Sequence, residues 1–437
     1  MERRFKDSGH SWIGSIPEHW EMHYLRGISN SFRKGNGITK EDLNSEGDIA
    51  CVRYGDLYTK YDHYLTTVEC RTNVSKIQNP VYASYGDIYF TCSGEDVEAI
   101  GKSIAFLSEE PCLVGGDLII MKHSQDPKYL GYSLDSYVSQ KQKSLGKSKL
   151  KVVHISVKDL KNIVVPLPPL AEQEAIAAYL DKKCGEIDEL IEVERQMISD
   201  LESYRQSVIT ETVTHGLNPA IELKDTGILW IGKIPKHWNL IPVQHFFEFR
   251  NGYTPSKANS SFWTNGSIPW FRMEDIRKSG RFLKKSLQYI TPEAMNNGGT
   301  FEAGSFILAI CTASIGEHAI LIADSLANQR FTNLKIRKSL IDLVETKYIF
   351  YYMFILGQFC KDTAIVTTFP YADMTRVKNF LVPMPPLNEQ QEIADYLDAK
   401  CVEIDELIKV KQEKIETLKQ YRQSLIFEAV TGKTTIS

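Results

Sequence analysis

The stretch "EQEAIAAYLDKKCGEIDELI" at Glu172–Ile191 recurs as "EQQEIADYLDAKCVEIDELI" at Glu389–Ile408, 217 residues further along the chain. The likeness extends over residues 165–214 and 382–431, where 31 of 50 positions are identical. A chain that carries one helical segment twice contains an internal repeat, and such a repeat constrains the architecture more than any single motif does.

Each copy predicts one long helix. The segments "VPLPPLAEQ" and "VPMPPLNEQ" place prolines just before the helical run, where a missing N–H is tolerated. Gly216 and Gly432 are suitable C-terminal stops. We expect each helix to hold about 45 residues and to be about 65 Å long, far longer than the average helix of a globular protein.

Apolar residues repeat along both helices in alternating steps of four and three, which is typical of a coiled-coil seam. One helix cannot bury such a stripe alone, and the nearest partner is the other copy. Because a globular region separates the copies, we expect antiparallel pairing with pseudo-twofold symmetry inside one chain. The predicted seam consists of Leu180, Cys184, Ile187, Ile191, Ile198 and Leu201 with Leu397, Cys401, Ile404, Ile408, Ile415 and Leu418.

Glu194 and Lys411 are charged residues at seam positions of the two copies. Their opposite charges either set the register of the pair or extend into solvent from a hydrated seam. The sequence leaves both interpretations open.

A shorter motif precedes each globular region. It reads "DSGHSWIGSIPEHW" at Asp7–Trp20 and "DTGILWIGKIPKHW" at Asp225–Trp238, with nine of 14 positions identical. Its tryptophans either stack on a ligand or seat each domain against the helices, and their repetition favours packing. His19 and His237 belong to the same motif, so we interpret them as structural too.

The intervening regions, 21–164 and 239–381, have similar lengths but largely different sequences. "CVRYGDL" at Cys51 nevertheless resembles "WFRMEDI" at Trp270. Short apolar runs such as "DLIIMK" and "SFILAI" predict strands, and residues 126–142 and 345–359 each predict one amphipathic helix. The fold class is therefore mixed α/β, with one fold filled by two sets of side chains, as expected for one task performed on two targets.

These patterns predict two globular domains and two long helices. The expected boundaries are 1–165 for the first domain, 166–216 for the first helix, 217–382 for the second domain and 383–437 for the second helix.

Composition narrows the class of protein. Apolar residues make up 43% of the chain, no apolar run is long enough to span a bilayer, and the N-terminus lacks the apolar segment of a secretory signal. Eight cysteines without a CxxC pair argue against a zinc site or a disulfide framework, so we expect no bound metal and a cytoplasmic location.

The net charge of −4 is unevenly distributed. Residues 171–215 carry a net −7 and 383–437 a net −3, whereas 1–170 are neutral and 216–382 carry a net +6. The acidity therefore lies in the repeated helices, and the globular regions remain compatible with a polyanionic partner.

Basic stretches in both globular regions are candidate DNA contacts. A solvated charge run is the alternative for each. Arg53 and Arg272 occupy matching positions and either read guanine or pair internally with Asp56 and Asp275; retention in both domains favours the internal pair. The candidates are Arg53, Lys141, Lys143, Lys147, Lys149 and Lys151 in the first region and Arg272, Arg277, Lys278, Arg281, Lys284 and Lys285 in the second.

The ordered pattern of "WIGxIPxHW", variable region and "PLPPLxEQxxIAxYLD" helix, present twice, resembles the specificity (S) subunit of type I restriction–modification systems over essentially the whole chain. The resemblance implies two target-recognition domains that each read one half of a bipartite site in double-stranded DNA. It further implies that the helices space these domains and dock two modification subunits, which bind S-adenosylmethionine and methylate adenine. Two restriction subunits, which use ATP and Mg²⁺, would complete an endonuclease.

The chain itself lacks the motifs of those partners. We find no S-adenosylmethionine glycine loop, no Asn/Asp-Pro-Pro-aromatic tetrapeptide and no GxxxxGK[ST] loop, so we expect a non-catalytic subunit without a cofactor of its own. A coiled-coil scaffold that joins two proteins and never touches DNA is the alternative. A methylation system without a nuclease would fit the same sequence.

Overall fold

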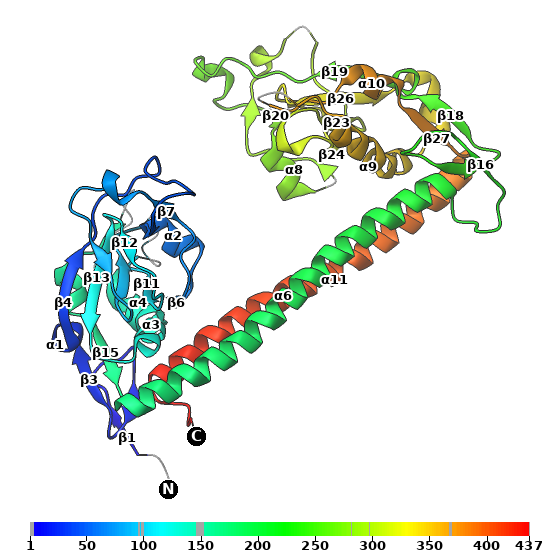
Figure 1. Cartoon of the computed structure of the whole chain (residues 1–437). Helices are drawn as coiled ribbons and strands as arrows, with labels where there is room; N and C mark the ends of the chain where they lie inside the picture. Colours follow the sequence, from blue (N-terminus) through cyan, green and yellow to red (C-terminus); the bar gives the residue numbers. More distant parts are fainter. Residues whose placement is uncertain are drawn as a thin grey trace. The chain divides into compact units, whose positions relative to one another are not determined.

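The computed structural model describes residues 4–436 except 95, 96, 98, 99, 146–152, 281, 297, 367 and 368, and the side chain of Ser279 also lies outside this description. The chain forms two compact units, Met1–Arg195 with Gln412–Ser437, and Gln196–Lys411. Each unit contains one globular domain and a segment of each of two long helices (Figure 1). The fold is mixed α/β.

The first domain is built on two sheets whose central strands are buried on both faces, which explains their uninterrupted apolar sequences. The larger sheet has the order β4-β13-β9-β11-β6 and the smaller has the order β7-β5-β12-β8. The strands of the larger sheet are β4 (Ser29–Lys34), β13 (Leu118–His123), β9 (Ile88–Thr91), β11 (Ser103–Phe106) and β6 (Tyr64–Leu65). Those of the smaller sheet are β7 (Arg71–Thr72), β5 (Ile49–Val52), β12 (Cys112–Val114) and β8 (Tyr82–Ala83).

The second domain repeats the topology of the larger sheet with other side chains, and its smaller sheet has three strands. Its larger sheet has the order β19-β26-β23-β24-β21, and a smaller one has the order β22-β20-β25. The expectation that both domains share one fold with different side chains is confirmed. β5 and β20 contain the first residues of "CVRYGDL" and "WFRMEDI", and β9 and β23 are the central strands of the two larger sheets. The strands are β19 (Phe247–Asn251), β26 (Phe331–Ile336), β23 (Phe306–Ala309), β24 (His318–Leu321), β21 (Phe282–Leu283), β22 (Tyr289–Ile290), β20 (Ile268–Phe271) and β25 (Leu326–Ala327).

Short antiparallel ribbons join the beginning of each domain to its end. The strand after each "WIGxIPxHW" motif pairs with the strand that leads into a long helix, as β3 with β15 and β18 with β27. Three further ribbons pair β1 with β2, β16 with β17 and β10 with β14. The strands are β3 (Glu21–Tyr24), β15 (Val164–Leu167), β18 (Asn239–Pro242), β27 (Leu381–Met384), β1 (Phe5–Asp7), β2 (Ser15–Pro17), β16 (Leu223–Asp225), β17 (Lys233–Pro235), β10 (Ser93–Gly94) and β14 (Val153–His154).

The predicted single helix over 126–142 is wrong, because two helices, α3 (Pro127–Asp135) and α4 (Tyr137–Ser144), meet at an extended Ser136. The Ser136 hydroxyl donates to the Ser133 carbonyl at 2.7 Å, which satisfies locally an acceptor that a continuous helix would use. The second domain does contain the single helix that was predicted, α9 (Thr346–Asp362). The remaining short helices are α1 (Leu25–Ile28), α2 (Tyr54–Thr59), α5 (Val157–Lys161), α7 (Val243–Phe246), α8 (Met273–Ser279) and α10 (Met374–Asn379). The 3-10 turns are η1 (Val74–Lys76), η2 (Ser260–Phe262), η3 (Pro292–Ala294), η4 (Thr312–Ser314) and η5 (Lys338–Leu343).

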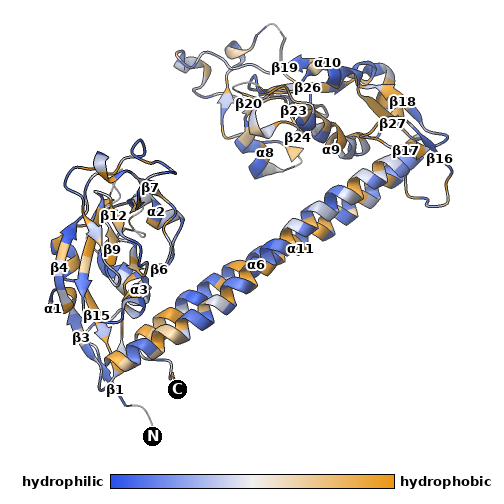
Figure 2. Ribbon diagram, viewed as in Figure 1, coloured by the Kyte–Doolittle hydropathy of each residue, from blue (hydrophilic) through white to orange (hydrophobic). Residues whose placement is uncertain are grey.

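The two repeated segments are helices of 46 and 44 residues, α6 (Leu170–His215) and α11 (Leu387–Val430). Both end before a glycine with positive φ, 75° at Gly216 and 71° at Gly432. Figure 2 shows apolar residues recurring along both helices between polar ones. The seam residues Leu180, Cys184, Ile187, Ile191, Leu397, Ile404, Ile408 and Ile415 are buried, and Ile198, Leu201, Cys401 and Leu418 are partly buried.

One predicted DNA contact lies in the core of the first domain. Lys143 is only 2% exposed, and its ammonium donates to Ser103 Oγ at 2.6 Å and to the Leu134 carbonyl at 2.5 Å. The prediction that Lys143 neutralises a phosphate is therefore wrong, because its side chain points inward from α4. Burial lowers the pKa of Lys143 to about 7, against the opposing charge of Asp135.

This burial predicts a pH-dependent stability for the first domain. Between pH 7 and the ordinary lysine value of 10.5 the unfolded chain holds a proton that folded Lys143 releases, so stability should rise with pH. In this window the free energy of unfolding of the wild type should rise relative to that of Lys143→Met by at most about 1.4 kcal/mol per pH unit. Chemical denaturation at pH 7 and pH 9 measures it, and parallel profiles for the two proteins would contradict the assignment.

Candidate nucleic-acid interface and its helix junctions

A carboxylate in the first turn of α6 holds the first "WIGxIPxHW" motif. Glu172 Oε1 lies 2.7 Å from His19 Nε2, and Glu172 Oε2 accepts a hydrogen bond from the indole of Trp20 at 3.0 Å. Trp20 is fully buried, and a Cβ at Gly432 would lie 2.5 Å from the Pro17 ring. One motif thus contacts the start of one long helix and the end of the other, and the acidic residue suits the positive end of the helix dipole.

The second unit repeats this junction. His237 Nε2 lies 2.7 Å from Glu389 Oε1, and the Trp238 indole donates to Glu389 Oε2 at 2.9 Å. A Cβ at Gly216 would lie 3.2 Å from the Trp238 ring. The interpretation of these motif residues as packing groups rather than stacking platforms is thus confirmed for Trp20 and Trp238.

The glutamine that follows each of these glutamates fastens the globular domain. Gln173 Oε1 accepts from the Asp126 amide at 3.0 Å, and its Nε2 donates to the Pro168 carbonyl at 2.8 Å. In the second unit Gln390 Oε1 accepts from the Glu345 amide at 2.9 Å. Both glutamines are buried, so each binds its domain through satisfied amide groups.

A second carboxylate, about two and a half helical turns after the glutamate, completes each junction. Asp181 accepts a hydrogen bond from the Tyr132 hydroxyl at 2.9 Å and pairs with Lys128. Asp398 accepts from the Tyr351 hydroxyl at 2.6 Å in the second unit. Sequence analysis assigned no role to these acidic residues, although their identity in both copies of the repeat was the signal that could have found them.

Within the first unit the two helix segments run in opposite directions. Asp188 pairs with Arg422 at 3.4 Å, and Glu194, further along α6, pairs with Lys414, earlier in α11, at 2.6 Å. Glu194 is buried, so it lies in the seam and does not extend into solvent. In the second unit the matching pair is Arg205–Asp405, at 2.6 Å.

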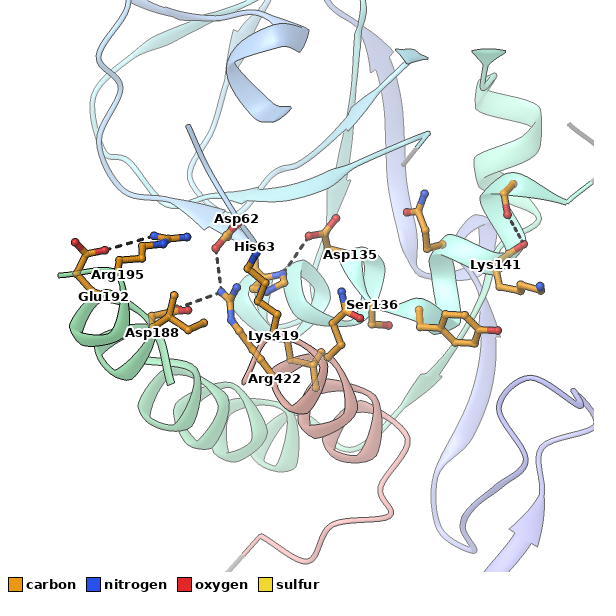
Figure 3. A pocket seen from close by; sticks show the side chains of 16 residues that line it. Asp62, His63, Asp135, Ser136, Lys141, Asp188, Glu192, Arg195, Lys419 and Arg422 are labelled. Atoms are coloured by element: carbon orange, nitrogen blue, oxygen red, sulfur yellow. Dashed lines mark hydrogen bonds and ion pairs between the residues drawn. The ribbon is translucent and has the colours of Figure 1, made fainter. Parts of the chain in front are cut away.

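The candidate DNA contacts of the first domain do not form one cluster. Arg53 caps α2 and pairs with Asp56 at 3.2 Å, as the internal-pair interpretation expected. Lys141 is exposed and lines a cavity between the domain and the helix segments (Figure 3). The candidates outside the described residues are Lys147, Lys149 and Lys151.

In the second domain the basic residues gather around α8 and β21. The backbone N–H of Arg272 donates to Asp275 Oδ2 at 2.7 Å, while its guanidinium pairs with Glu274 at 2.8 Å. Arg277 lies 3.5 Å from Glu317 and keeps most of its side chain exposed. The exposed candidates are Lys278, Lys284 and Lys285, and Arg281 lies outside the described residues. Contact of any of these residues with DNA stays a prediction.

The junction geometry predicts that Glu172 stabilises the first unit through its two charge-assisted hydrogen bonds. Glu172→Gln should lower the free energy of unfolding by about 1 kcal/mol, since both partners then face a neutral amide. Chemical denaturation followed by tryptophan fluorescence measures the loss. Glu174→Gln is the matched control, because Glu174 is exposed in the same helical turn. An equal loss in the control would show that only the helix dipole matters.

Among the residues that the structure describes, neither a membrane-spanning helix nor a candidate metal site is found. None of their helices has the length and apolar content needed to cross a membrane. No group of three or more His, Cys, Asp or Glu side chains among them is placed to hold a metal ion.

Comparison with known proteins assigns the family. The model of the type I restriction modification DNA specificity domain matches residues 17–203 and again 235–420. The putative type I restriction enzyme MjaX specificity subunit of Methanocaldococcus jannaschii is 25% identical over 437 residues, which cover 96% of this chain and 95% of the relative. The type I restriction enzyme EcoprrI specificity subunit of Escherichia coli is 44% identical over 155 residues, only 35% of this chain and 38% of that relative.

A solved structure shares the fold. It belongs to a study of the assembly and conformational transition of the type I R-M system, and its chain aligns with a TM-score of 0.70 at 16% identity, over 96% of this chain and 99% of the other. The family matches coincide with the two halves of the repeat, each of which contains one globular domain and one long helix. The chain therefore belongs to the type I restriction–modification DNA specificity family.

Proposed function

We propose that each globular domain reads one half of an asymmetric, bipartite site in double-stranded DNA for a type I restriction–modification complex. The observation that carries this proposal is the pair of larger sheets with the same strand order but different side chains. Two domains that share one fold but carry different side chains are suited to one task, base readout, on two different DNA sequences. Base edges specify the sequence, and the exposed basic residues position the domain on phosphates.

The two long helices form the spacer in this proposal. They pair along their length as an antiparallel coiled coil with pseudo-twofold symmetry. The opposed order of partners in the first unit and the Arg205–Asp405 pair in the second support this arrangement. A helix of 46 residues is about 70 Å long at about 1.5 Å per residue, which exceeds the 34–36 Å between half-sites of simple dimeric readers. A stiff spacer also fixes the distance better than a flexible linker.

The same helices dock two adenine-methyltransferase subunits. Exposed apolar residues recur at matching positions of the two copies, Leu190 with Leu407 and Val193 with Val410. Residues three apart share one helix face, so each copy presents an equivalent apolar patch. The methyltransferase subunits supply S-adenosylmethionine and the methyl transfer, so this chain is non-catalytic. Two restriction subunits that use ATP and Mg²⁺ are the further partners.

Selection from a random duplex library tests the recognition. The chain with its modification subunits should enrich a motif of two unlike half-sites at a fixed gap. Enrichment of no motif, with the modification subunits still bound, would favour a scaffold that does not touch DNA.

A chimera sharpens this test. When residues 239–381 are replaced by residues 21–164, both positions carry the first domain, and the pseudo-twofold arrangement should enrich an inverted repeat of one half-site. The unaltered chain is the control. A chimera that still selects two unlike half-sites would contradict the assignment of one half-site to each domain.

Docking has its own prediction. Leu190→Asp with Val193→Asp should remove one of two bound methyltransferase subunits, because the charges replace an apolar contact on one copy only. Native mass spectrometry gives the stoichiometry. Ile341→Asp is the control, since Ile341 is similarly exposed but lies on the second domain. Retention of two subunits by the double variant would place docking elsewhere.

A further inference from the structure

Arg422 connects the end of α11 with the first globular domain. Its Nη2 lies 3.0 Å from Asp62 Oδ2 of that domain and 3.4 Å from Asp188 Oδ2 of α6. Figure 3 shows the guanidinium between the two carboxylates. One side chain therefore ties together the domain and both helix segments of the first unit.

The charges of Arg422 and Asp62 support each other, whereas burial raises the pKa of Asp188 against the attraction of Arg422. The Arg422 side chain is 20% exposed, and although burial lowers its pKa, Asp62 and Asp188 outweigh burial and raise it. Burial raises the pKa of Asp62, but the charge and hydrogen bond of Arg422 dominate and lower it. The pair therefore stays ionised at neutral pH.

This contact lines a cavity of about 1000 Å³ between the first domain and the helix segments of its unit. Domain residues Asp62, His63 and Asp135 line one side, and the helix residues Asp188 and Arg422 line the other. The junction contacts described above end at Asp181. Asp188 lies seven residues further along α6, about 10 Å at about 1.5 Å per residue. A contact at that distance opposes rotation of the domain about its junction. Contacts close to the junction resist such a rotation poorly, because they act on a short lever arm.

The second unit has the same arginine without the same contact. Arg205 occupies the position of Arg422 in the repeat and pairs with Asp405 at 2.6 Å. Tyr64 and Phe282 hold equivalent places in the two larger sheets, so the place of Asp62 is taken by Gly280, which has no side chain. Among the described residues, Arg205 forms no ion pair with the second domain.

We propose that Asp62 and Arg422 are positioning residues that fix the orientation of the first domain, so that the first half-site is read from a rigid reference and the second domain adapts to it. This proposal rests on the proposed function. It concerns the distance tolerated between half-sites, because neither residue needs to touch a base.

Asp62→Asn tests the inference in the chain assembled with its modification subunits. Asp62 is 64% exposed, so the substitution removes the ion pair with little effect on folding, which thermal unfolding verifies. Methylation is measured on duplexes that carry both half-sites at the preferred gap and at gaps one base pair shorter and longer. Preference for the natural gap should fall by about two- to fivefold, as expected for the loss of a partly exposed ion pair, while the bases required in each half-site stay the same.

Two comparisons separate positioning from a general structural effect. Glu69→Gln removes another ion pair of the first domain, Lys60–Glu69 at 2.8 Å, and should leave the gap preference unchanged. Raising the salt concentration should reduce the gap preference of the wild type towards that of Asp62→Asn, since screening weakens the ion pair; the ratio between gaps cancels the general salt effect on DNA binding.

The outcomes distinguish the two proposals. If the wild-type complex methylates no bipartite site, the proposed function fails. If it does and Asp62→Asn keeps the wild-type gap preference, or Glu69→Gln loses as much, the positioning role is wrong while the proposed function stands.

Discussion

The structure depends on the need of each long helix to bury an apolar stripe that it cannot bury alone. A stripe of one residue every three to four positions over more than 40 residues leaves a continuous apolar surface on an isolated helix. In both units, segments of α6 and α11 bury these stripes against each other and against the globular domain. The core of the second unit contains Ile209 and Val213 of α6 beside Leu397 of α11 and Tyr348 of the domain. Helix pairing and domain packing in the second unit therefore share one hydrophobic core.

The polar junctions give this apolar contact its geometry. Hydrophobic burial is non-directional, whereas the carboxylates of Glu172 and Asp181 and the amide of Gln173 each require particular partners at hydrogen-bond distance. Their counterparts Glu389, Asp398 and Gln390 make equivalent contacts. The equivalence explains why the helices and their flanking motifs resemble each other so closely although the sheets do not.

The sequence was sufficient to predict what depends on local periodicity. Both long helices, the seam and the shared fold of the domains followed from repeats and apolar spacing. It was insufficient where the outcome depends on residues distant in the chain. Lys143 belongs to a basic stretch, yet α4 turns it towards Ser103 and Leu134. The break between α3 and α4 at Ser136 was not predicted, because the amphipathic pattern continues through this residue.

The two domains differ in how they meet the helices as well as in their sheets. The first domain reaches α11 through Asp62, a residue that a loop before β6 carries towards Arg422. In the second domain the matching region holds Gly280 and Phe282 beside a cavity of about 710 Å³. The two copies of the repeat thus share their junction contacts and differ in the contacts further along the helices.

The first unit is assembled from both ends of the chain, and this sets an order on its biosynthesis. The Tyr129 hydroxyl donates to the Val430 carbonyl at 3.4 Å, and the Lys433 ammonium donates to the Ile13 carbonyl at 2.8 Å. The second unit is one contiguous segment, Gln196–Lys411. A ribosome therefore releases every residue of the second unit before the first has its final helix, which reverses the usual N-terminal-first order. Until residues 412–430 have been synthesised, the part of the apolar stripe on α6 that faces α11 in the first unit stays exposed to solvent.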